Sequence, residues 1–235
     1  MENLFTDPKL LQQIDILQTQ LGTAIWETIY SLFFQVLFAY VIGLPLGVLL
    51  VTGEKGGIRP IPAWLLTLIN TVINILRSIP FLILVIIAMP LSKIIVGTKV
   101  GTVATIPPMV IAAFPLVARM VESSLREVDK GVIEAAQSMG ASPMQIIRKV
   151  LLPEALPSLI SGGTITLTTI LGYGAMAGIL GGGGLGKLAI DYGLYNFRRL
   201  VMWTAVVLII ALVQIFQTSG TRLSAASDKR LRKIK

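Results

Sequence analysis

Apolar runs long enough to cross a lipid bilayer dominate this sequence. One of them, LFFQVLFAYVIGLPLGVLL, covers residues 32–50 and contains no charged side chain. A helix needs about 20 largely apolar residues to span the hydrocarbon core of a bilayer. Because such runs recur along the chain, the sequence predicts an all-α, polytopic membrane protein.

The composition supports a membrane location and restricts the chemistry. Hydrophobic residues make up 54% of the chain and charged residues 14%, whereas soluble domains carry roughly 25% charged residues. The mean hydropathy of +0.81 leaves too little polar surface to cover a soluble globule. The chain has no cysteine and no histidine, which excludes thiolate metal ligands and removes the commonest general base. We therefore predict no catalytic residue and no metal site.

Five membrane spans are predicted, at residues 23–51, 64–91, 103–121, 159–179 and 200–216. The motif RSIP, at residues 77–80, interrupts the second region, which could be split into two helices. This pattern divides the chain into an extracytoplasmic N-terminal segment (residues 1–20), a transmembrane domain (residues 21–217) and a basic tail (residues 218–235). A polar stretch at residues 122–157 separates the third span from the fourth.

The distribution of Lys and Arg predicts the orientation. One face of the membrane would hold the loop near residue 55, the polar stretch and the tail, which together carry 13 Lys and Arg, whereas the other face carries six. Arg77 is counted with neither face because it lies within an apolar region. Since cytoplasmic loops carry the excess of basic residues, we expect the N-terminus outside and the C-terminus in the cytoplasm. The net charge of +8 therefore reports orientation, and no nucleic-acid partner is expected.

The polar stretch is predicted to contain two short helices. From Gly131 to Met139 the apolar residues recur at helical spacing, and Gly140 stands where a residue in the left-handed conformation ends a helix. Ser142 and Pro143 are typical of an N-cap and a first helical position. The second helix, MQIIRKVLL, is expected to end before Pro153, because the residue preceding a proline avoids the helical conformation.

The segment EAAQSMGASPMQIIRKVLLPEALP resembles the cytoplasmic EAA loop of permease subunits in type I ABC importers. The matching positions are Glu134, Ala135, Ala136, Gly140, Leu152 and Pro153. The segments LRSIPFLILVI, ARMVESSLREV and GYGAMAGILGGGGLG look like the methionine-uptake branch of that family. The resemblance thus extends over most of the chain, and its five-span topology is the one predicted above.

This resemblance implies a function. The EAA loop, including Ser142 and Pro143 here, would form a coupling helix that docks into a groove on a cytosolic ATPase. The small side chains of Ala135 and Ala136 would let the ATPase approach closely beside Glu134. The transporter would contain two copies of this permease with the path between them, two ATPases and an extracytoplasmic substrate-binding (lipo)protein, in a prokaryotic inner or plasma membrane. ATP and Mg would bind to the ATPase, and this chain would bind no cofactor. The substrate would be L- and D-methionine or close analogues.

Three alternatives remain open at this point. The chain could be the permease of an importer for another amino acid or small solute. A membrane enzyme would be expected to place paired acids or a histidine near the interface, whereas the 12 acidic residues here include no close D-x-x-D-type pair. A secondary transporter would usually have more spans and inverted repeats.

Six residues are candidates for lining the substrate path: Arg77, Ser78, Thr166, Thr169, Tyr173 and Met176. Arg77 could attract a substrate carboxylate, but a helix break at Ser78 and Pro80, with Arg77 serving the freed carbonyls, is the favoured interpretation. The small residues from Gly162 to Gly174 suit close helix packing and, through threonine hydroxyls, a polar path equally well.

The stretch GILGGGGLGKLAI, residues 178–190, contains the first seven positions of a phosphate-binding loop. That motif requires Ser or Thr after the lysine, whereas Leu188 follows Lys187 here. The stretch also follows a predicted membrane span instead of a strand, so nucleotide binding is rejected. We expect a tight, non-helical connection at the outer mouth, where glycine allows positive φ angles. Glu27 is interpreted as a group at the outer interface.

The predicted orientation can be tested at Lys187. In the variant Lys187→Cys, the introduced thiol is expected to react with a membrane-impermeant maleimide applied from outside, and the absence of native cysteine makes the labelling specific. Labelling from the cytoplasmic side alone would invert the predicted topology.

Overall fold

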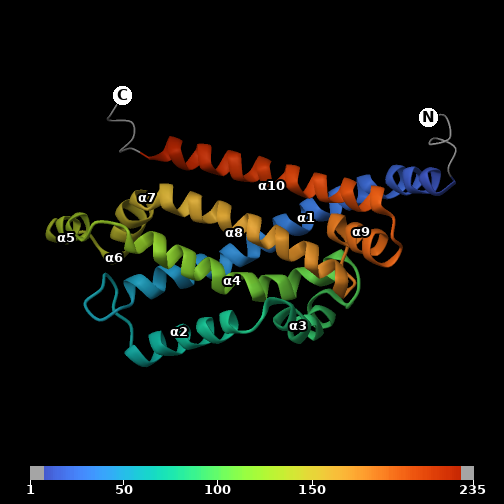
Figure 1. The fold of residues 1–235 in the computed structure, drawn as a ribbon. Helices are drawn as coiled ribbons and strands as arrows, with labels where there is room; N and C mark the ends of the chain where they lie inside the picture. The colour runs from blue at the N-terminus through green and yellow to red at the C-terminus, as the bar shows by residue number, and fades with distance from the viewer. Residues whose placement is uncertain (1–7, 229–235) are drawn as a thin grey trace. The chain divides into compact units, whose positions relative to one another are not determined.

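The computed structural model describes residues 8–228, in which every regular element is a helix and no strand occurs. The elements are α1 (Pro8–Thr52), α2 (Ala63–Ser78), α3 (Phe81–Val96), α4 (Thr102–Arg126), α5 (Lys130–Ser138), α6 (Pro143–Ile146), η2 (Ile147–Leu151), α7 (Leu152–Glu154), α8 (Leu156–Ala177), η3 (Gly178–Leu180), α9 (Gly184–Ala189), η4 (Ile190–Tyr195) and α10 (Arg199–Ser227). Figure 1 shows their order along the chain. The all-α prediction is confirmed.

Four helices are long and apolar enough to cross a membrane by themselves: α1, α4, α8 and α10. The pair α2 and α3 qualifies as a fifth span if it is counted as one interrupted crossing, which agrees with the five predicted regions. The predicted first span began near residue 23, whereas α1 already begins at Pro8. The first residues of the N-terminal segment and the last of the basic tail lie outside the described part of the chain, and the sidedness of both stays a prediction.

The interruption of the second apolar region lies at the predicted motif. Helix α2 ends at Ser78, Ile79 is extended with ψ of 130°, and α3 begins at Phe81. A proline disfavours the helical conformation in the residue before it, because the proline ring crowds the backbone of that residue, and Ile79 is extended here. Ser78 donates a hydrogen bond to the Asn74 carbonyl at 2.8 Å. This arrangement confirms that the RSIP motif breaks the helix.

The chain forms two compact units, and four long helices contribute a part to each. The first unit comprises the chain up to Val36, Phe81–Ile111 and Thr169–Ile215. Its core joins Ala24 of α1, Leu185 and Leu188 of α9, and Val201 and Ala205 of α10. Each of these side chains is buried, so α9 is held in place by close packing against α1 and α10.

The second unit comprises Leu37–Pro80, Ala112–Thr168 and the chain from Phe216 onward. Leu50 of α1, Ile73 of α2 and Ala118 of α4 form a buried cluster in it. Helix α1 approaches α4 closely at two glycines: a Cβ added to Gly43 would lie 2.6 Å from the Val117 Cβ, and one added to Gly47 would lie 2.6 Å from the Ala118 carbonyl oxygen. Small residues permit this close approach between membrane helices.

This contact gives a prediction for Gly47→Ala. Alanine favours a helix over glycine by about 1 kcal/mol, but overpacking at a tight contact costs about 1–3 kcal/mol. We therefore expect a lower apparent Tm in detergent for Gly47→Ala. The control Gly22→Ala lies in the same helix with no atom within 4 Å of the added Cβ, and it is expected to keep or raise the Tm. Equal Tm values for the two variants would show that the contact does not limit stability.

Candidate functional site

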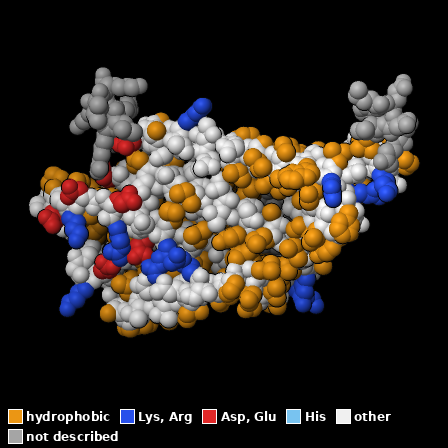
Figure 2. All heavy atoms as spheres, viewed as in Figure 1, with side chains coloured by type: hydrophobic (Ala, Val, Ile, Leu, Met, Phe, Trp, Pro, Cys, Tyr) orange, Lys and Arg blue, Asp and Glu red, His pale blue; other side chains and the backbone are white. Residues whose placement is uncertain are grey.

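The segment that connects α4 to α8, residues 127–155, is the candidate site, and it lies entirely within the second unit. It contains the short helices α5, α6 and α7 (Figure 1). Figure 2 shows acidic side chains gathered around these short helices, with lysine and arginine side chains nearby. The segment is thus a structured polar region between two apolar helices, as the sequence predicted.

Helix α5 has a defined start and end. Asp129 caps the N-terminus, since its carboxylate accepts a hydrogen bond from the Gly131 N–H at 2.7 Å. At the other end the Gly140 N–H donates to the Gln137 carbonyl and the Ala141 N–H donates to the Ala136 carbonyl. These two bonds form a Schellman motif, which requires the left-handed conformation that Gly140 adopts with φ of +76°. The predicted end at Gly140 is confirmed.

The second short helix begins with a complete capping box. The Ser142 hydroxyl accepts from the Gln145 N–H at 3.4 Å, and the Gln145 side-chain oxygen accepts from the Ser142 N–H at 2.8 Å. Pro143 follows at the first helical position, where its missing N–H is not needed. The sequence predicted the roles of Ser142 and Pro143, and the structure confirms them.

The predicted end of this helix before Pro153 is wrong. The chain passes from α6 through η2, a π-helical turn, into α7, so Leu152 and Pro153 are both helical. In η2 the Leu152 N–H donates to the Ile147 carbonyl. This wider turn accommodates a proline that would clash in a regular α-helix, where the ring meets the carbonyl four residues earlier. The restriction on a residue that precedes proline is a preference, and Leu152 adopts the helical conformation with φ of −66° and ψ of −44°.

The exposed surface of the segment differs from the prediction at one alanine. Helix α5 packs against η2, and Ala136 is only 4% exposed, so it lies inside the segment instead of on an open surface. Glu134 and Ala135 are exposed. The side chain of Met139 is 80% exposed although it belongs to a polar region outside the apolar spans.

A network of charged and polar groups holds the end of α4, from which the segment departs. The Arg119 guanidinium bonds to the Glu122 carboxylate at 2.5 Å and to the Asn74 side-chain oxygen at 2.7 Å. Arg126 bonds to Glu122 at 2.9 Å and to Glu54 at 2.6 Å. Linked pairs of this kind hold their geometry better than an isolated surface pair. The network ties α4 to α2 and to the loop after α1.

Local spacing in the sequence indicates only one part of this network. The pair of Arg119 with Glu122 follows from their i,i+3 spacing. The contact between Arg126 and Glu54 joins residues 72 positions apart, and no local spacing could have indicated it. Asn74 was missed as well, since an asparagine in an apolar helix carries no signal about its partner.

The candidate path residues of the second unit differ in exposure. Arg77 and Ser78, at the end of α2, are exposed. Thr166, in α8, is fully buried and donates its hydroxyl to the Gly162 carbonyl at 2.9 Å. The same helix packs closely at Gly162 and Gly163, whose added Cβ atoms would meet Met120 and Tyr40. Helix packing therefore explains why Thr166 is buried and why glycine occupies positions 162 and 163.

The candidate path residues of the first unit lie on α8. Thr169 and Tyr173 are half-buried, and Met176 is 48% exposed. The Tyr173 ring stacks on Phe81, the first residue of α3, with centroids 3.9 Å apart and planes 16° apart. The stacking links α8 to the start of α3. A role for these residues in transport stays a prediction.

The glycine-rich stretch is partly helical, unlike the expected non-helical connection. Gly181–Gly183 do form a tight turn, with φ of +81° at Gly181, but α9 begins at Gly184. The Glu27 carboxylate accepts from the Gly184 N–H at 2.7 Å, and the Thr28 hydroxyl accepts from the Leu185 N–H at 2.9 Å. Glu27 is therefore a helix-capping group and not merely interfacial. A carboxylate within an apolar helix was the signal for such a polar partner.

The geometry also excludes a phosphate-binding loop. Among the described residues no strand precedes the glycines, and Leu188, where the motif requires a hydroxyl, is buried in the core. Apolar helices, a broken second span and a capped polar segment between the third and fourth spans agree with the type I ABC importer permease that the sequence resembles. Residues 43–233 match the family model described as binding-protein-dependent transport system inner membrane component. The chain belongs to this family.

Several proteins of known name are similar over most of the chain. The probable D-methionine transport system permease protein MetI of Vibrio cholerae is 49% identical over 209 residues, which cover 88% of this chain and 92% of that protein. The D-methionine transport system permease protein MetI of Escherichia coli K12 is 50% identical over 154 residues, which cover 66% of this chain and 70% of that protein. A chain of the inward-facing MetNI methionine ABC transporter has a TM-score of 0.87 and 45% identity, over 91% of this chain and 98% of that one.

Family membership defines what this chain contributes. It is a membrane permease subunit of an ABC importer, and ATP hydrolysis belongs to a separate subunit. The interpretations as a secondary transporter or a membrane enzyme are therefore excluded.

The Schellman motif of α5 gives a prediction for Gly140→Ala. A left-handed conformation costs an L-residue about 1–2 kcal/mol, while the added Cβ meets no atom within 4 Å, so the penalty arises from the backbone alone. We expect faster hydrogen exchange at the Ala141 amide, which bonds to the Ala136 carbonyl. Gly140→Asn is expected to have a smaller effect, because asparagine tolerates this conformation. Unchanged exchange in Gly140→Ala would contradict the role assigned to the motif.

Proposed function

We propose that this chain forms the translocation path of an ATP-driven methionine importer, for L- and D-methionine or close analogues. The observation that carries the proposal is the 45% identity and TM-score of 0.87 to a chain of a methionine ABC transporter, over 98% of that chain. The relatives from Vibrio cholerae and Escherichia coli are named as D-methionine permeases. Likeness at this level over nearly the whole length supports a common substrate class more strongly than a shared fold does.

The chain is proposed to act as a homodimer with the path between the two copies, each copy docked on one cytosolic ATPase. The docking surface is the exposed part of α5 and its C-terminal turn, with Glu134, Ala135 and Met139 at its centre. The two short helices are held in position by Gly140, at the end of α5, and by Ser142 and Pro143, at the start of α6. Ala136 packs inside the segment, and Leu152 and Pro153 form its last helical turn. ATP and Mg bind to the ATPase, and no cofactor is assigned to this chain.

The capped geometry suggests how motion passes from the ATPase to the membrane. Both short helices have satisfied ends, and α5 packs on η2, so a displacement of the docking surface moves the segment as one piece. Arg119, Glu122 and Arg126 then connect the end of α4 to Asn74 and Glu54. ATP-driven closure of the two ATPases would thereby switch the path between inward-open and outward-open states.

The orientation and the external partner are part of the proposal. The excess of Lys and Arg supports a cytoplasmic location for residues 127–155 and for the C-terminus. An extracytoplasmic binding protein would then deliver substrate at the opposite face, as the family description implies. The path residues would be Arg77, Ser78, Thr166, Thr169, Tyr173 and Met176, with Thr166 contributing through packing because it is buried.

Reconstituted transport tests this function. Proteoliposomes that contain the permease, its ATPase and its binding protein are expected to accumulate labelled methionine with ATP. Omission of the ATPase or of the binding protein is expected to abolish accumulation. Accumulation by the permease alone would overturn the importer mechanism, and efficient uptake of other amino acids in preference to methionine would overturn the substrate.

Charge reversal at Glu134 tests the docking surface in the same assay. Glu134→Lys is expected to lower both uptake and the amount of copurified ATPase by at least tenfold, because a like charge at a protein interface costs several kcal/mol. Membrane insertion is expected to stay normal, since Glu134 is exposed. The control Glu127→Lys reverses another exposed glutamate, outside the two short helices, and is expected to have little effect. Normal uptake in Glu134→Lys would exclude α5 from the docking surface.

A further inference from the structure

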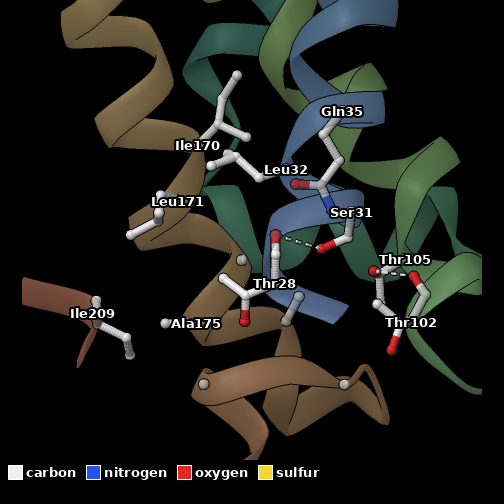
Figure 3. Close-up of a pocket in the computed structure, with 14 residues that line it drawn as sticks. Thr28, Ser31, Leu32, Gln35, Thr102, Thr105, Ile170, Leu171, Ala175 and Ile209 are labelled. Carbon is white, nitrogen blue, oxygen red and sulfur yellow. Dashed lines mark hydrogen bonds between the residues drawn. The ribbon is translucent and has the colours of Figure 1, made fainter. Parts of the chain in front are cut away.

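A small polar cavity lies inside the first unit and is lined in part by Gly183 and Gly186 of the glycine-rich stretch (Figure 3). Its polar lining comes from Thr28, Ser31 and Gln35 of α1 and from Thr102 and Thr105 of α4. Glycine and alanine from α8 and α9 line much of the remainder and leave the space open: Gly174, Ala175, Ala177 and Gly186. The cavity is separate from the coupling segment, all of which belongs to the second unit.

Two buried polar side chains face this cavity. Thr102 is 6% exposed, and its hydroxyl makes no hydrogen bond to a described residue. Gln35 is 2% exposed, and Figure 3 shows its amide directed towards the cavity, with no hydrogen bond drawn to the other lining residues. An unsatisfied polar group buried in a protein costs about 1–3 kcal/mol, and the absence of water from a membrane interior makes this cost harder to avoid.

The other hydroxyls of the cavity donate to backbone carbonyls and keep acceptor capacity. Ser31 donates to the Thr28 carbonyl at 3.2 Å, and Thr105 donates to the Thr102 carbonyl at 2.7 Å. Each hydroxyl oxygen can accept further hydrogen bonds. The site therefore offers donors from Gln35 and Thr102 and acceptor oxygens from all five polar side chains, which suits a ligand that both donates and accepts.

The size and charge of the cavity restrict the ligand. Its volume is about 30 Å³, and a water molecule needs roughly 10–15 Å³ of such space. The cavity is thus too small for an amino acid and large enough for two waters. No carboxylate belongs to its lining, so a cation would be buried there without a compensating charge, which is costly.

We propose that this cavity binds a pair of water molecules that bridge Gln35 of α1 to Thr102 of α4. Each buried water typically makes about three hydrogen bonds, and the five polar side chains supply that number for both. The waters join α1 and α4 directly below Gly183, at which an added Cβ would collide with the Thr102 hydroxyl and the Glu27 carboxylate. They complete a polar contact that the side chains do not make by themselves.

The sign of a stability change tests this assignment. Thr102→Val replaces the hydroxyl with a methyl group of similar shape. With bound water, the variant removes a hydrogen-bond partner, and we expect the apparent Tm of the purified permease–ATPase complex to fall by roughly 2–4 °C. In a dry cavity the variant would remove an unsatisfied hydroxyl and raise the Tm. A raised or unchanged Tm therefore overturns the proposal.

Gln35→Leu and the double variant provide a second measurement. Because either substitution releases the shared waters, the Tm loss in the double variant is expected to be smaller than the sum of the two single losses. Additive changes would exclude a shared ligand. Thr52→Val is the matched control: Thr52 is equally buried but donates to the Val48 carbonyl at 2.9 Å, outside this cavity. It measures the effect of the same replacement at a satisfied site.

The identity of the ligand is tested by exchanging the salt. The Tm of the unaltered complex is expected to be the same in sodium, potassium and choline chloride at one ionic strength. A higher Tm in sodium or potassium alone would identify a cation and overturn the assignment to water. A high-resolution structure is expected to show two ordered waters within hydrogen-bond distance of Gln35 and Thr102. The absence of electron density at these positions would also overturn the assignment to water.

Discussion

Close contact between helix backbones is the constraint on which each unit of this protein depends. In a bilayer the lipid is as apolar as the side chains, so helices associate through close packing and hydrogen bonds and gain little from apolar burial. Gly43 and Gly47 bring α1 against α4 in the second unit, and Gly186 brings α9 against Ala175 in the first. At each position a single methyl group would overlap a neighbouring atom. Glycine is therefore required for contact here as much as for backbone conformation.

The second requirement is that polar backbone groups find partners at every interruption of a helix. Glu27 and Thr28 accept hydrogen bonds from the first two amides of α9, and Asp129 and Ser142 each accept one from an amide in the first turn of α5 and α6. These caps explain why glycine-rich and polar segments keep defined shapes next to apolar helices. In the coupling segment they produce a compact element that can transmit a displacement, which is the property an importer needs between its ATPase and its membrane path.

Local signals in the sequence predicted much of this protein because their causes are local. Hydrophobic runs are long because the bilayer is thick, so the spans could be located without a structure. Gly140, Ser142 and Pro143 act through their own backbone conformations, and each was placed correctly. The end predicted at Pro153 was wrong, since the chain continues there through a π-helical turn into a further helical turn. Such a turn depends on packing around it and has no signature in the residues themselves.

The sequence by itself determined the membrane environment, the helical class, the approximate spans and the capped coupling segment, since all of these follow from hydrophobicity and from residues within one turn of each other. Only the tertiary structure decided the contacts between distant positions. Arg126 reaches Glu54, Glu27 caps α9, and Thr102 and Gln35 meet at one cavity. Contacts between residues so far apart in the chain cannot be predicted from the sequence. Any buried polar side chain could in principle pair with any other, and only the packing of the helices decides which two meet.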